Sequence, residues 1–478
     1  MSLVVHSFAL LATEARPVQV EVDLLRRLPS MVVIGLPGHA VRETADRVRS
    51  AVQNLTSHHE WPRQRIVVNL YPADLPKVGT AFDLPIAVGV LAASGQLAQV
   101  PDGFLAATAF TGELSLTGQL RPVRGVLAMV QAAAAAGLKR VVVPLANAAE
   151  AMMGATEDCQ VVPLADLDEV VDWLDLGRLA LHQVRVPAVE RDLRDTVGGR
   201  RRAKRAMEIA AAGGHGVRLI GAPGAPAARL ARLLSLYLPD LDPAAALEAT
   251  TAYAAAGLLS ERHPRVQHAP FRAPHHTIST AGMVGALSAP SSLGEVALAH
   301  HGVLLLEDVE EFSPAVRGQL SGALGRGSVG GYAAPLGLRW SVPARPILVT
   351  VERPCDCRGP CSGGCGGASL ADRQRVCADL VARGLRPLVV DLGVPDPEQA
   401  DALPVVRARV ARARRRAAAR DQAMPEVLTL GDEAAAHAHR MGWSVRDELL
   451  AVARTIADLA DSDEVRVEHL EEAASFVA

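Results

Sequence analysis

The chain has 478 residues, a length that usually divides into about three domains. Its net charge is -3, so charge alone indicates neither a nucleic-acid nor a membrane partner. Although 49% of the residues are hydrophobic, no apolar run approaches the roughly 18 residues of a membrane span, and the N-terminus lacks the basic start of a signal peptide. We therefore expect a cytoplasmic protein with no membrane partner.

The first segment, residues 1–170, alternates short strands with helices. Residues 17–24 alternate apolar and polar side chains, and residues 65–72 and 139–146 are short β-branched runs next to turn residues. A helix is predicted from about Val123 to Ala136, closed by the glycine that follows. This pattern predicts a domain of the α/β or α+β class.

A linker is predicted at residues 171–199, which end in charge and two glycines. The last unit, residues 397–478, has helical periodicity, with a turn at Asp461–Asp463 between its last two helices. It contains an arginine-rich run at residues 407–420. Arginines in such a run could contact DNA phosphates or could form an ordinary solvated helix face, and both interpretations stay open.

The second unit, residues 200–396, begins with an amphipathic helix and continues with the strand VRLIG at residues 217–221. A loop rich in Gly and Pro follows, and then a helix rich in Leu and Arg. Further apolar strands are predicted at residues 302–308 and 345–351. Strand, loop and helix followed by more buried strands is typical of a parallel nucleotide-binding sheet.

The segment LIGAPGAPAARL, residues 219–230, has the position and shape of a phosphate-binding loop. Gly221 and Gly224 lie between the predicted strand and the predicted helix. A working loop has the pattern GxxxxGK[ST], because its backbone N–H groups and lysine approach the phosphates while its hydroxyl binds Mg²⁺.

Three positions of that pattern are changed. The second glycine is Pro226, the lysine position is Ala227 and the hydroxyl position is Ala228. Pro226 removes an N–H donor, while the two alanines remove a positive charge and a metal ligand. No lysine follows Lys204, and Arg229 lies about 200° around the helix from the lysine position. Nothing nearby replaces the lost lysine in kind.

The run GVLLLEDVEEF, residues 302–312, is an apolar strand that ends in two carboxylates, the expected second half of a nucleotide site. The usual order is Asp, which orients the metal, and then Glu, which polarises water. Here the order is Glu307 and then Asp308, so each carboxylate is displaced by roughly one methylene, a shift that can cost about 10²-fold in rate.

Long strings of residues resemble the ComM/YifB family of magnesium-chelatase-like AAA+ proteins, over nearly the whole chain. The strings that resemble its N-terminal domain are VVIGLPGHAVRETADRVRSAV (32–52), RIVVNLYPADLPKVGTAFDLPIAVGVLAASGQL (65–97), TGELSLTGQLRPVRGVL (111–127) and VVVPLANAAEA (141–151). Those that resemble its AAA+ module are RRAKRAMEIAAAGGH (201–215), PFRAPHHTIST (270–280), GEVALAHHGVLLLEDVEEFS (294–313) and RPCDCRGPC (353–361). The run SVRDELLAVARTIADL (444–459) resembles the family's C-terminal helical lid.

The resemblance implies an α/β fold with three parts: a Lon-protease-like (ribosomal S5 domain 2-like) N-terminal domain, a P-loop AAA+ module and a helical lid. It also implies rings, usually hexamers, that bind DNA and use ATP and Mg²⁺ for branch migration or helicase movement in transformation and recombination. The matching nucleotide-site residues are Gly221, Gly224, Ala227, Ala228 and Arg446, and the matching catalytic residues are Glu307 and Asp308.

Further departures from the family pattern fall on the chemistry. Arg353 stands where the family has the Asn that helps to position the attacking water, and residues 377–392 match poorly a stretch that supplies charged residues between subunits. In the N-terminal domain, Ala81 stands where Lon-like proteases have their nucleophilic Ser, so no proteolysis by that mechanism is expected. Lys77 then has either a structural or a DNA-facing role.

Four cysteines, Cys355, Cys357, Cys361 and Cys365, form a C-x-C-x₃-C-x₃-C cluster. Four thiolates could hold a tetrahedral Zn²⁺ ion, although C-x-C is tight for two ligands of one ion. The alternative is a reduced loop inherited from the family.

The departures lead to three hypotheses. The first is a pseudo-ATPase that acts as a scaffold or joins a ring with an active paralogue on DNA. The second is a weakened ATP-dependent DNA translocase or branch-migration helicase, for which Glu307, Asp308 and Arg446 would have to suffice. The third is a decaying paralogue with little function. The resemblance implies ATP and Mg²⁺ as cofactors, while the altered loop argues against their binding.

Overall fold

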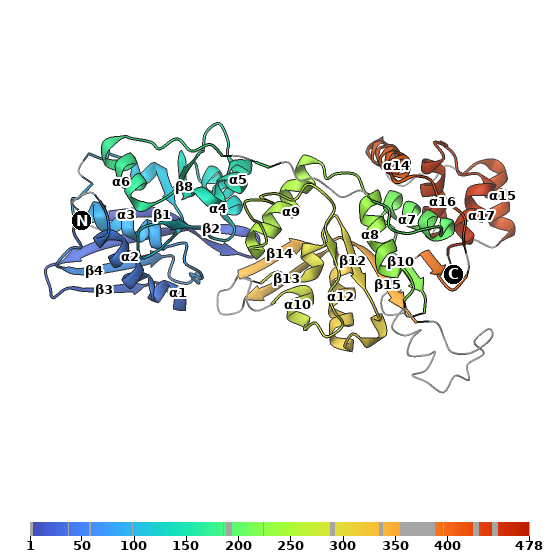
Figure 1. The fold of residues 1–478 in the computed structure, drawn as a ribbon, viewed down its shortest axis with the longest axis horizontal. Coiled ribbons are helices and arrows are strands. Elements are labelled where there is room, and N and C mark those ends of the chain that lie inside the picture. The colour runs from blue at the N-terminus through green and yellow to red at the C-terminus, as the bar shows by residue number, and fades with distance from the viewer. Residues whose placement is uncertain are drawn as a thin grey trace.

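The computed structural model describes residues 3–36, 38–56, 59–97, 99–184, 186–187, 194–222, 224–286, 292–333, 338–353, 388–394, 396–423, 430–441 and 448–477. An N-terminal α/β domain, a central α/β module and a C-terminal group of helices follow one another along the long axis of the molecule (Figure 1). The predicted α/β class is confirmed for the first two parts, and the predicted helical character for the third.

The N-terminal domain is built on a seven-stranded mixed sheet. Its strands are, in spatial order, β3 (Ser30–Ile34), β4 (Arg65–Tyr71), β2 (Glu14–Leu25), β1 (Leu3–Leu11), β5 (Thr108–Phe110), β8 (Arg140–Pro144) and β9 (Gln160–Leu164). Strand β2 pairs antiparallel with both β1 and β4, and the other neighbours are parallel. The three strands predicted from sequence patterns correspond to β2, β4 and β8.

Helices cover both faces of this sheet, as the alternation along β8 shows. Val142 belongs to one apolar cluster, with α2 (Thr44–Gln53), α3 (Asp83–Ala93) and α6 (Leu167–Leu176), while Val141 and Val143 belong to another, with α4 (Val126–Ala135). A strand buried on both faces needs no polar positions, which explains its unbroken valine run. The remaining short elements are α1 (His39–Arg42), β6 (Glu113–Leu114), β7 (Leu120–Arg121) and α5 (Ala148–Ala151).

Two sequence expectations can be compared with the helices of this domain. Helix α4 ends near the predicted residue, and Gly137 follows it with φ +76°, the left-handed conformation that a C-terminal glycine cap requires. Helix α6 continues to Leu176, so the first six residues of the segment predicted as a linker, 171–176, are helical. The chain leaves this helix at Gly177, whose φ is +64°.

The central module has a five-stranded parallel sheet in the order β11 (Phe271–Arg272), β12 (Val303–Leu306), β15 (Ile347–Glu352), β10 (Val217–Ile220) and β16 (Leu388–Asp391). One face packs on α7 (Arg201–Gly213) and α8 (Ala227–Tyr237). The opposite face packs on α10 (Thr280–Val284), α11 (Glu295–Leu298) and α12 (Pro314–Arg326). The predicted parallel sheet is therefore confirmed.

The N-terminal domain touches the central module in two places. The turn between β1 and β2 places Ala12, with 4% exposure, in the apolar cluster of the module that includes the hairpin β13 (Ser328–Ala333) and β14 (Leu338–Pro343). The Gly125 N–H donates to the Ala254 carbonyl, 3.0 Å away, in α9 (Pro243–Ala256). The N-terminal domain therefore contacts the central module at the β13–β14 hairpin and at α9.

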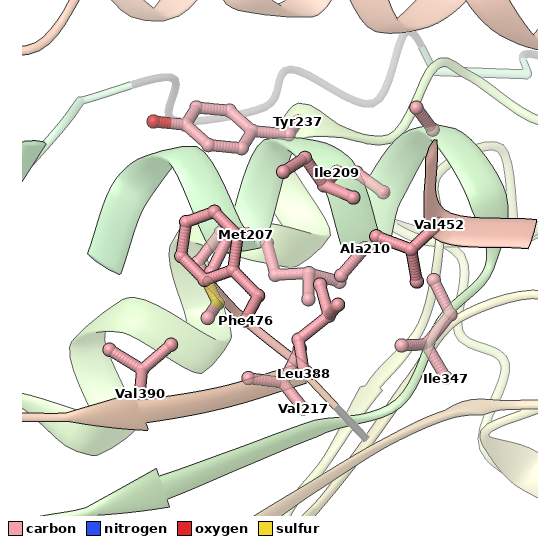
Figure 2. Close-up of a cluster of buried hydrophobic side chains, with 14 of the residues drawn as sticks. Met207, Ile209, Ala210, Val217, Tyr237, Ile347, Leu388, Val390, Val452 and Phe476 are labelled. Carbon is pink, nitrogen blue, oxygen red and sulfur yellow. The ribbon is translucent and has the colours of Figure 1, made fainter. Parts of the chain in front are cut away.

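The C-terminal helices are α14 (Leu403–Ala423), α15 (Asp432–Arg440), α16 (Glu448–Leu459) and α17 (Val467–Ala474). Residues of α14, α15, α16 and α17 belong to the same apolar cluster as α7 and α8. Figure 2 shows two residues of this part, Val452 of α16 and Phe476 after α17, in one cluster with Met207 and Ala210 of α7. The predicted turn between the last two helices is present, with φ +55° at Asp461. No helix in the described part of the chain is both long and apolar enough to cross a membrane.

A buried carboxyl group in the N-terminal domain gives a test of this fold. Burial raises the pKa of Glu150 to about 7, against the effect of the Asn147 amide that donates to it at 2.7 Å. Because the folded-state pKa is the higher one, the folded state binds the proton more tightly, and stability falls as the pH rises from about 4.5 through about 7.

We therefore expect Glu150→Gln to raise the free energy of unfolding by up to about 3 kcal/mol at about pH 8, and by less at about pH 5. Denaturant unfolding of both proteins at the two pH values measures the difference. Glu157→Gln, at an exposed position of the same domain, is the control and should shift stability little at either pH. An equal gain at both pH values would contradict the buried-carboxylate explanation.

Candidate functional site

The carboxyl edge of the parallel sheet brings the two halves of the predicted nucleotide site together. Strand β10 runs into the loop at Gly221, and Glu307 and Asp308 directly follow β12. Strand β15 lies between these two strands and pairs with both, and Arg353 directly follows it. In open parallel sheets, ligands bind outside this edge.

Three backbone N–H groups of the loop donate to carbonyls within the protein. The N–H of Gly221 donates to the Glu352 carbonyl at 3.0 Å, that of Ala225 to Ala222 at 3.0 Å, and that of Ala227 to Ala225 at 2.8 Å. Pro226, the residue before α8, has no N–H at all. A phosphate cradle needs N–H groups directed at the ligand, and these three are directed at carbonyls of the chain.

The two positions that should carry the lysine and the hydroxyl face the core instead. Ala227 is 3% exposed and belongs to the apolar cluster under α7 and α8, and Ala228 packs against that cluster. Arg229 is exposed, and its guanidinium lies 3.5 Å from the Thr196 carbonyl, as expected for a side chain on another face of the helix. No cation of the loop replaces the missing lysine in the described residues.

The carboxylates at the end of β12 have different environments. Glu307 is exposed. Asp308, with φ +49°, accepts a hydrogen bond from Arg353 Nε at 2.9 Å, and the same guanidinium contacts Glu311 at 3.2 Å. His276 lies 3.5 Å from the other side of that Glu311 carboxylate. The carboxylate of Asp308 is therefore already paired with a positive charge of the chain itself, that of Arg353.

Other carboxylates flank the start of the loop. Ile220, the last residue of β10, lies in register with Glu352 on one side and Asp391 on the other. Arg218 pairs with Glu352 at 2.6 and 2.9 Å, whereas Asp391 is exposed. Two of the carboxylates at the described edge, Asp308 and Glu352, are therefore paired with arginines of the chain.

These observations decide whether the residues fit Mg²⁺ and ATP. The lysine and hydroxyl are absent, three loop N–H groups are bonded internally, and Asp308 is paired with Arg353. The described residues do not fit the bound nucleotide that the sequence pattern of the sheet would suggest. No hydrolytic step can be derived from them.

Comparison with known proteins identifies the family. A family profile described as magnesium chelatase, subunit ChlI, matches residues 192–375, and one described as subunit ChlI of Mg-chelatase matches residues 20–147. A protein named YifB from Salmonella typhimurium is 34% identical over an alignment of 508 positions, which covers 100% of this chain and 97% of that protein. The competence protein ComM from Haemophilus influenzae is 37% identical over 362 residues, 74% of this chain and 69% of that protein.

The chain belongs to the ComM/YifB family of magnesium-chelatase-like AAA+ proteins. The resemblance seen in the sequence is thereby confirmed. A Lon protease from Lachnoclostridium phytofermentans is also similar, at 27% identity over 157 residues, 32% of this chain and 19% of that protein. The detailed Lon-like arrangement of the N-terminal domain and the lid arrangement of the C-terminal helices stay predictions.

Ala81, which matches the Ser position of Lon-like proteases in sequence, and Lys77 both lie in the core. Ala81 is 6% exposed and packs in the apolar cluster with α4. Lys77 is fully buried, its ammonium donates to the Pro72 carbonyl, and burial lowers its pKa to about 8. The structural role that the sequence left open for Lys77 is supported, because a buried amine cannot reach DNA.

Two groups of predicted site residues lie outside the described residues. They are Arg446 and the four cysteines, Cys355, Cys357, Cys361 and Cys365. A zinc site in the cysteine loop and a nucleotide contact from Arg446 stay predictions.

The arginine-rich run lies in α14, and most of its side chains are engaged within the chain. Six of its arginines contact acidic side chains or a carbonyl: Arg407 with Asp240, Arg409 with Glu208, Arg412 with Asp461, Arg414 with the Ala211 carbonyl, Arg416 with Asp463 and Arg420 with Asp458. These contacts tie α14 to the module and to the turn after α16. Neither a free DNA-binding stripe nor a simple solvated face describes this helix.

Sequence reasoning missed the partner of the two histidines before β12. Glu248 of α9 contacts His300 Nε2 at 3.1 Å and His301 Nε2 at 2.9 Å, a set with the composition of a metal site. The Arg345 N–H donates to His300 Nδ1 at 3.2 Å, so the proton of this imidazole is on Nε2, the atom that a metal would need. Burial lowers the pKa of His300 to about 4, which keeps the ring neutral at pH 7. The cluster is therefore a hydrogen-bonded link between α9 and the sheet.

This assignment predicts how the cluster responds to metal. Added Zn²⁺ should change the melting temperature of the natural protein and of His301→Ala by the same amount, because any metal effect would come from elsewhere in the chain. Differential scanning fluorimetry with and without Zn²⁺ measures both shifts. A zinc-dependent stabilisation that disappears in His301→Ala would show that Glu248, His300 and His301 hold the ion.

Proposed function

We propose that this chain is a pseudo-ATPase of the ComM/YifB family, which joins a ring on DNA without hydrolysing ATP itself. The observation that carries the proposal is the loop after β10, where alanines replace the lysine and the hydroxyl and the N–H groups of Gly221, Ala225 and Ala227 are bonded to carbonyls. The competence function in the name of the Haemophilus relative supports a place in the processing of DNA taken up during transformation.

The intact frame around the loop supports a scaffold role. The parallel sheet, its helices and the C-terminal helices share one apolar cluster of buried residues, and the alanines at the lysine and hydroxyl positions contribute to it. A chain that has lost only its ligand groups can still present the surfaces with which family rings assemble. The ring would contain copies of this chain alone or together with an active paralogue.

The second candidate is a weak ATP-dependent DNA translocase. It is favoured by one observation, the two carboxylates Glu307 and Asp308 that directly follow β12. For this candidate, Arg353 would have to leave Asp308 when nucleotide arrives. Steady-state phosphate release in the presence of single-stranded DNA separates the candidates: turnover above background that Glu307→Ala abolishes would place the translocase first.

Restoring the loop tests the nucleotide site. We expect no binding of Mg²⁺ and ATP by the natural protein at concentrations up to about 1 mM, equivalent to less than about 4 kcal/mol of binding free energy. The triple variant Pro226→Gly, Ala227→Lys, Ala228→Thr should bind measurably, because it restores an N–H donor, a charge and a metal ligand. Isothermal titration calorimetry measures both.

The matched control carries Ala227→Met in place of Ala227→Lys, with the other two changes kept. It adds similar bulk at this buried position without the charge, so it should bind more weakly than the lysine variant. Circular dichroism confirms that both variants are folded. Micromolar binding by the natural protein would contradict the proposal.

DNA binding is expected to be independent of nucleotide. Fluorescence anisotropy with single-stranded and branched DNA should give the same Kd with and without Mg²⁺ and ATP, and the affinity should fall as salt rises, because phosphate contacts release counterions. A Kd that ATP changes tenfold would argue for coupling through a working site. No DNA binding at low salt would remove DNA from the proposal.

A further inference from the structure

Helix α7 joins the central module to the C-terminal helices. Met207 and Ala210 pack in one cluster with Val217 and Leu388 of the sheet and with Phe476, which follows α17 (Figure 2). Apolar contacts of this kind hold two parts close together, but they are not directional. The orientation of the C-terminal helices therefore has to come from other contacts.

A network of ion pairs around Glu208 of α7 supplies directional contacts. Glu208 is 3% exposed and pairs with Arg205 of the same helix, at 2.9 Å, and with Arg409 of α14. Arg205 also reaches α17, where it binds both carboxylate oxygens of Glu472 at 2.7 and 3.2 Å. Arg409 binds Asp401 at 2.9 Å. We call these five residues the Glu208 network.

The Glu208 network connects three helices through one buried carboxylate. A buried carboxylate that loses its partners is strongly unfavourable, whereas a bidentate guanidinium pair has a fixed geometry. If α14 or α17 moved by the length of a side chain relative to α7, Glu208 would lose Arg409, or Arg205 would be drawn away towards Glu472. The arrangement therefore favours one position of the C-terminal helices.

Single hydrogen bonds near the Glu208 network also connect the central module to the C-terminal helices. Arg202 of α7 donates to the Ser475 carbonyl at 2.7 Å, His215 contacts Thr455 of α16 at 2.8 Å, and the Val389 N–H of β16 donates to the Phe476 carbonyl at 2.7 Å. These contacts join the module to the end of the chain on both sides of α7.

A cavity of about 780 Å³ opens beside the network. It is lined by five basic residues, Arg201, Arg202, Lys204, Arg205 and Arg409. All five already contact carboxylates or a carbonyl of the chain. The basic side chains that line the cavity are therefore already paired within the chain and are not arranged to bind an anionic ligand. They contribute to the contact between the central module and the C-terminal helices.

We propose that the Glu208 network is a clamp that fixes the orientation of the C-terminal helices with the protein's own charges, in place of a bound nucleotide. The clamp gives the chain one ring-competent shape at all ATP concentrations. The clamp itself requires only the contacts between α7, α14 and α17, whereas its role in place of nucleotide rests on the pseudo-ATPase proposal.

A charge swap in the full chain tests the clamp. In Arg205→Glu and in Glu472→Arg, amide hydrogen exchange in α17 should speed up by at least about tenfold, because each single change places like charges together. The double variant reverses the Arg205–Glu472 pair, so exchange in α17 should be slower than in either single variant. It should stay faster than in the natural protein, because the new carboxylate at position 205 lies beside Glu208. Exchange in α12, on the opposite face of the sheet, should not change in any of these proteins.

Two further variants keep the result interpretable. Arg201→Glu with Glu398→Arg swaps a pair between α7 and the segment before α14, whose side chains are 66% and 65% exposed, and it should leave α17 unchanged. Glu208→Gln keeps the size of the side chain and removes only its charge, so it reports on the clamp if the charge reversals prevent folding. It should also speed exchange in both α14 and α17.

The clamp is overturned if Arg205→Glu, Glu472→Arg and Glu208→Gln all exchange like the natural protein, or if the double swap is no better than the single variants. A separate measurement with Mg²⁺ and ATP keeps the two proposals apart. Protection of α17 by ATP would contradict the pseudo-ATPase proposal, while the swap result would still decide whether the network orients the helices.

Discussion

The burial of α7 is the interaction on which the rest of the central structure depends. One side of this helix packs on the parallel sheet next to β10 and β16, and its apolar residues share their cluster with the C-terminal helices. The burial of α7 on β10 and β16, together with that of α8 on β12, covers this face of the sheet with apolar side chains. The loop, the carboxylates and Arg353 meet at one edge because the strands that carry them are packed in this way.

At the carboxyl edge of the parallel sheet, the side chains of the loop differ from the phosphate-binding pattern, while the strands and helices around the loop are present. In a working loop, the lysine and the hydroxyl bind ligand and contribute nothing to the core, so their loss need not destabilise the fold. Here Ala227 is buried in the core, and the N–H groups of Gly221, Ala225 and Ala227 are bonded to carbonyls of the protein. After β12, the positive charge of Arg353 compensates the negative charges of Asp308 and Glu311.

Arginine has a structural role at several distant places in this protein. Arg205 and Arg409 link three helices through Glu208, and Arg353 closes the carboxyl edge of the sheet. The guanidinium group can bind two carboxylates at once in fixed directions, which an ammonium group does less well. A chain with almost all its positive charge on arginine can therefore use ion pairs to set orientations between helices.

The sequence by itself determined the family, the parallel sheet and the altered loop. Those features are local: the strand patterns at residues 217–221 and 302–308 and the alanines at 227 and 228 are visible without any knowledge of the fold. Apolar periodicity also predicted α4 and its glycine cap, because a helix end depends on a few neighbouring residues.

Only the tertiary structure decided which charges meet. Glu248 is 52 residues from His300, and Arg353 is 45 residues from Asp308, so no spacing rule connects them. The arginine run of α14 was ambiguous for the same reason, since its partners Glu208 and Asp458 lie on other helices. A side chain's charge is written in the sequence, but its partner is set by packing, and packing decided that these arginines hold the protein together.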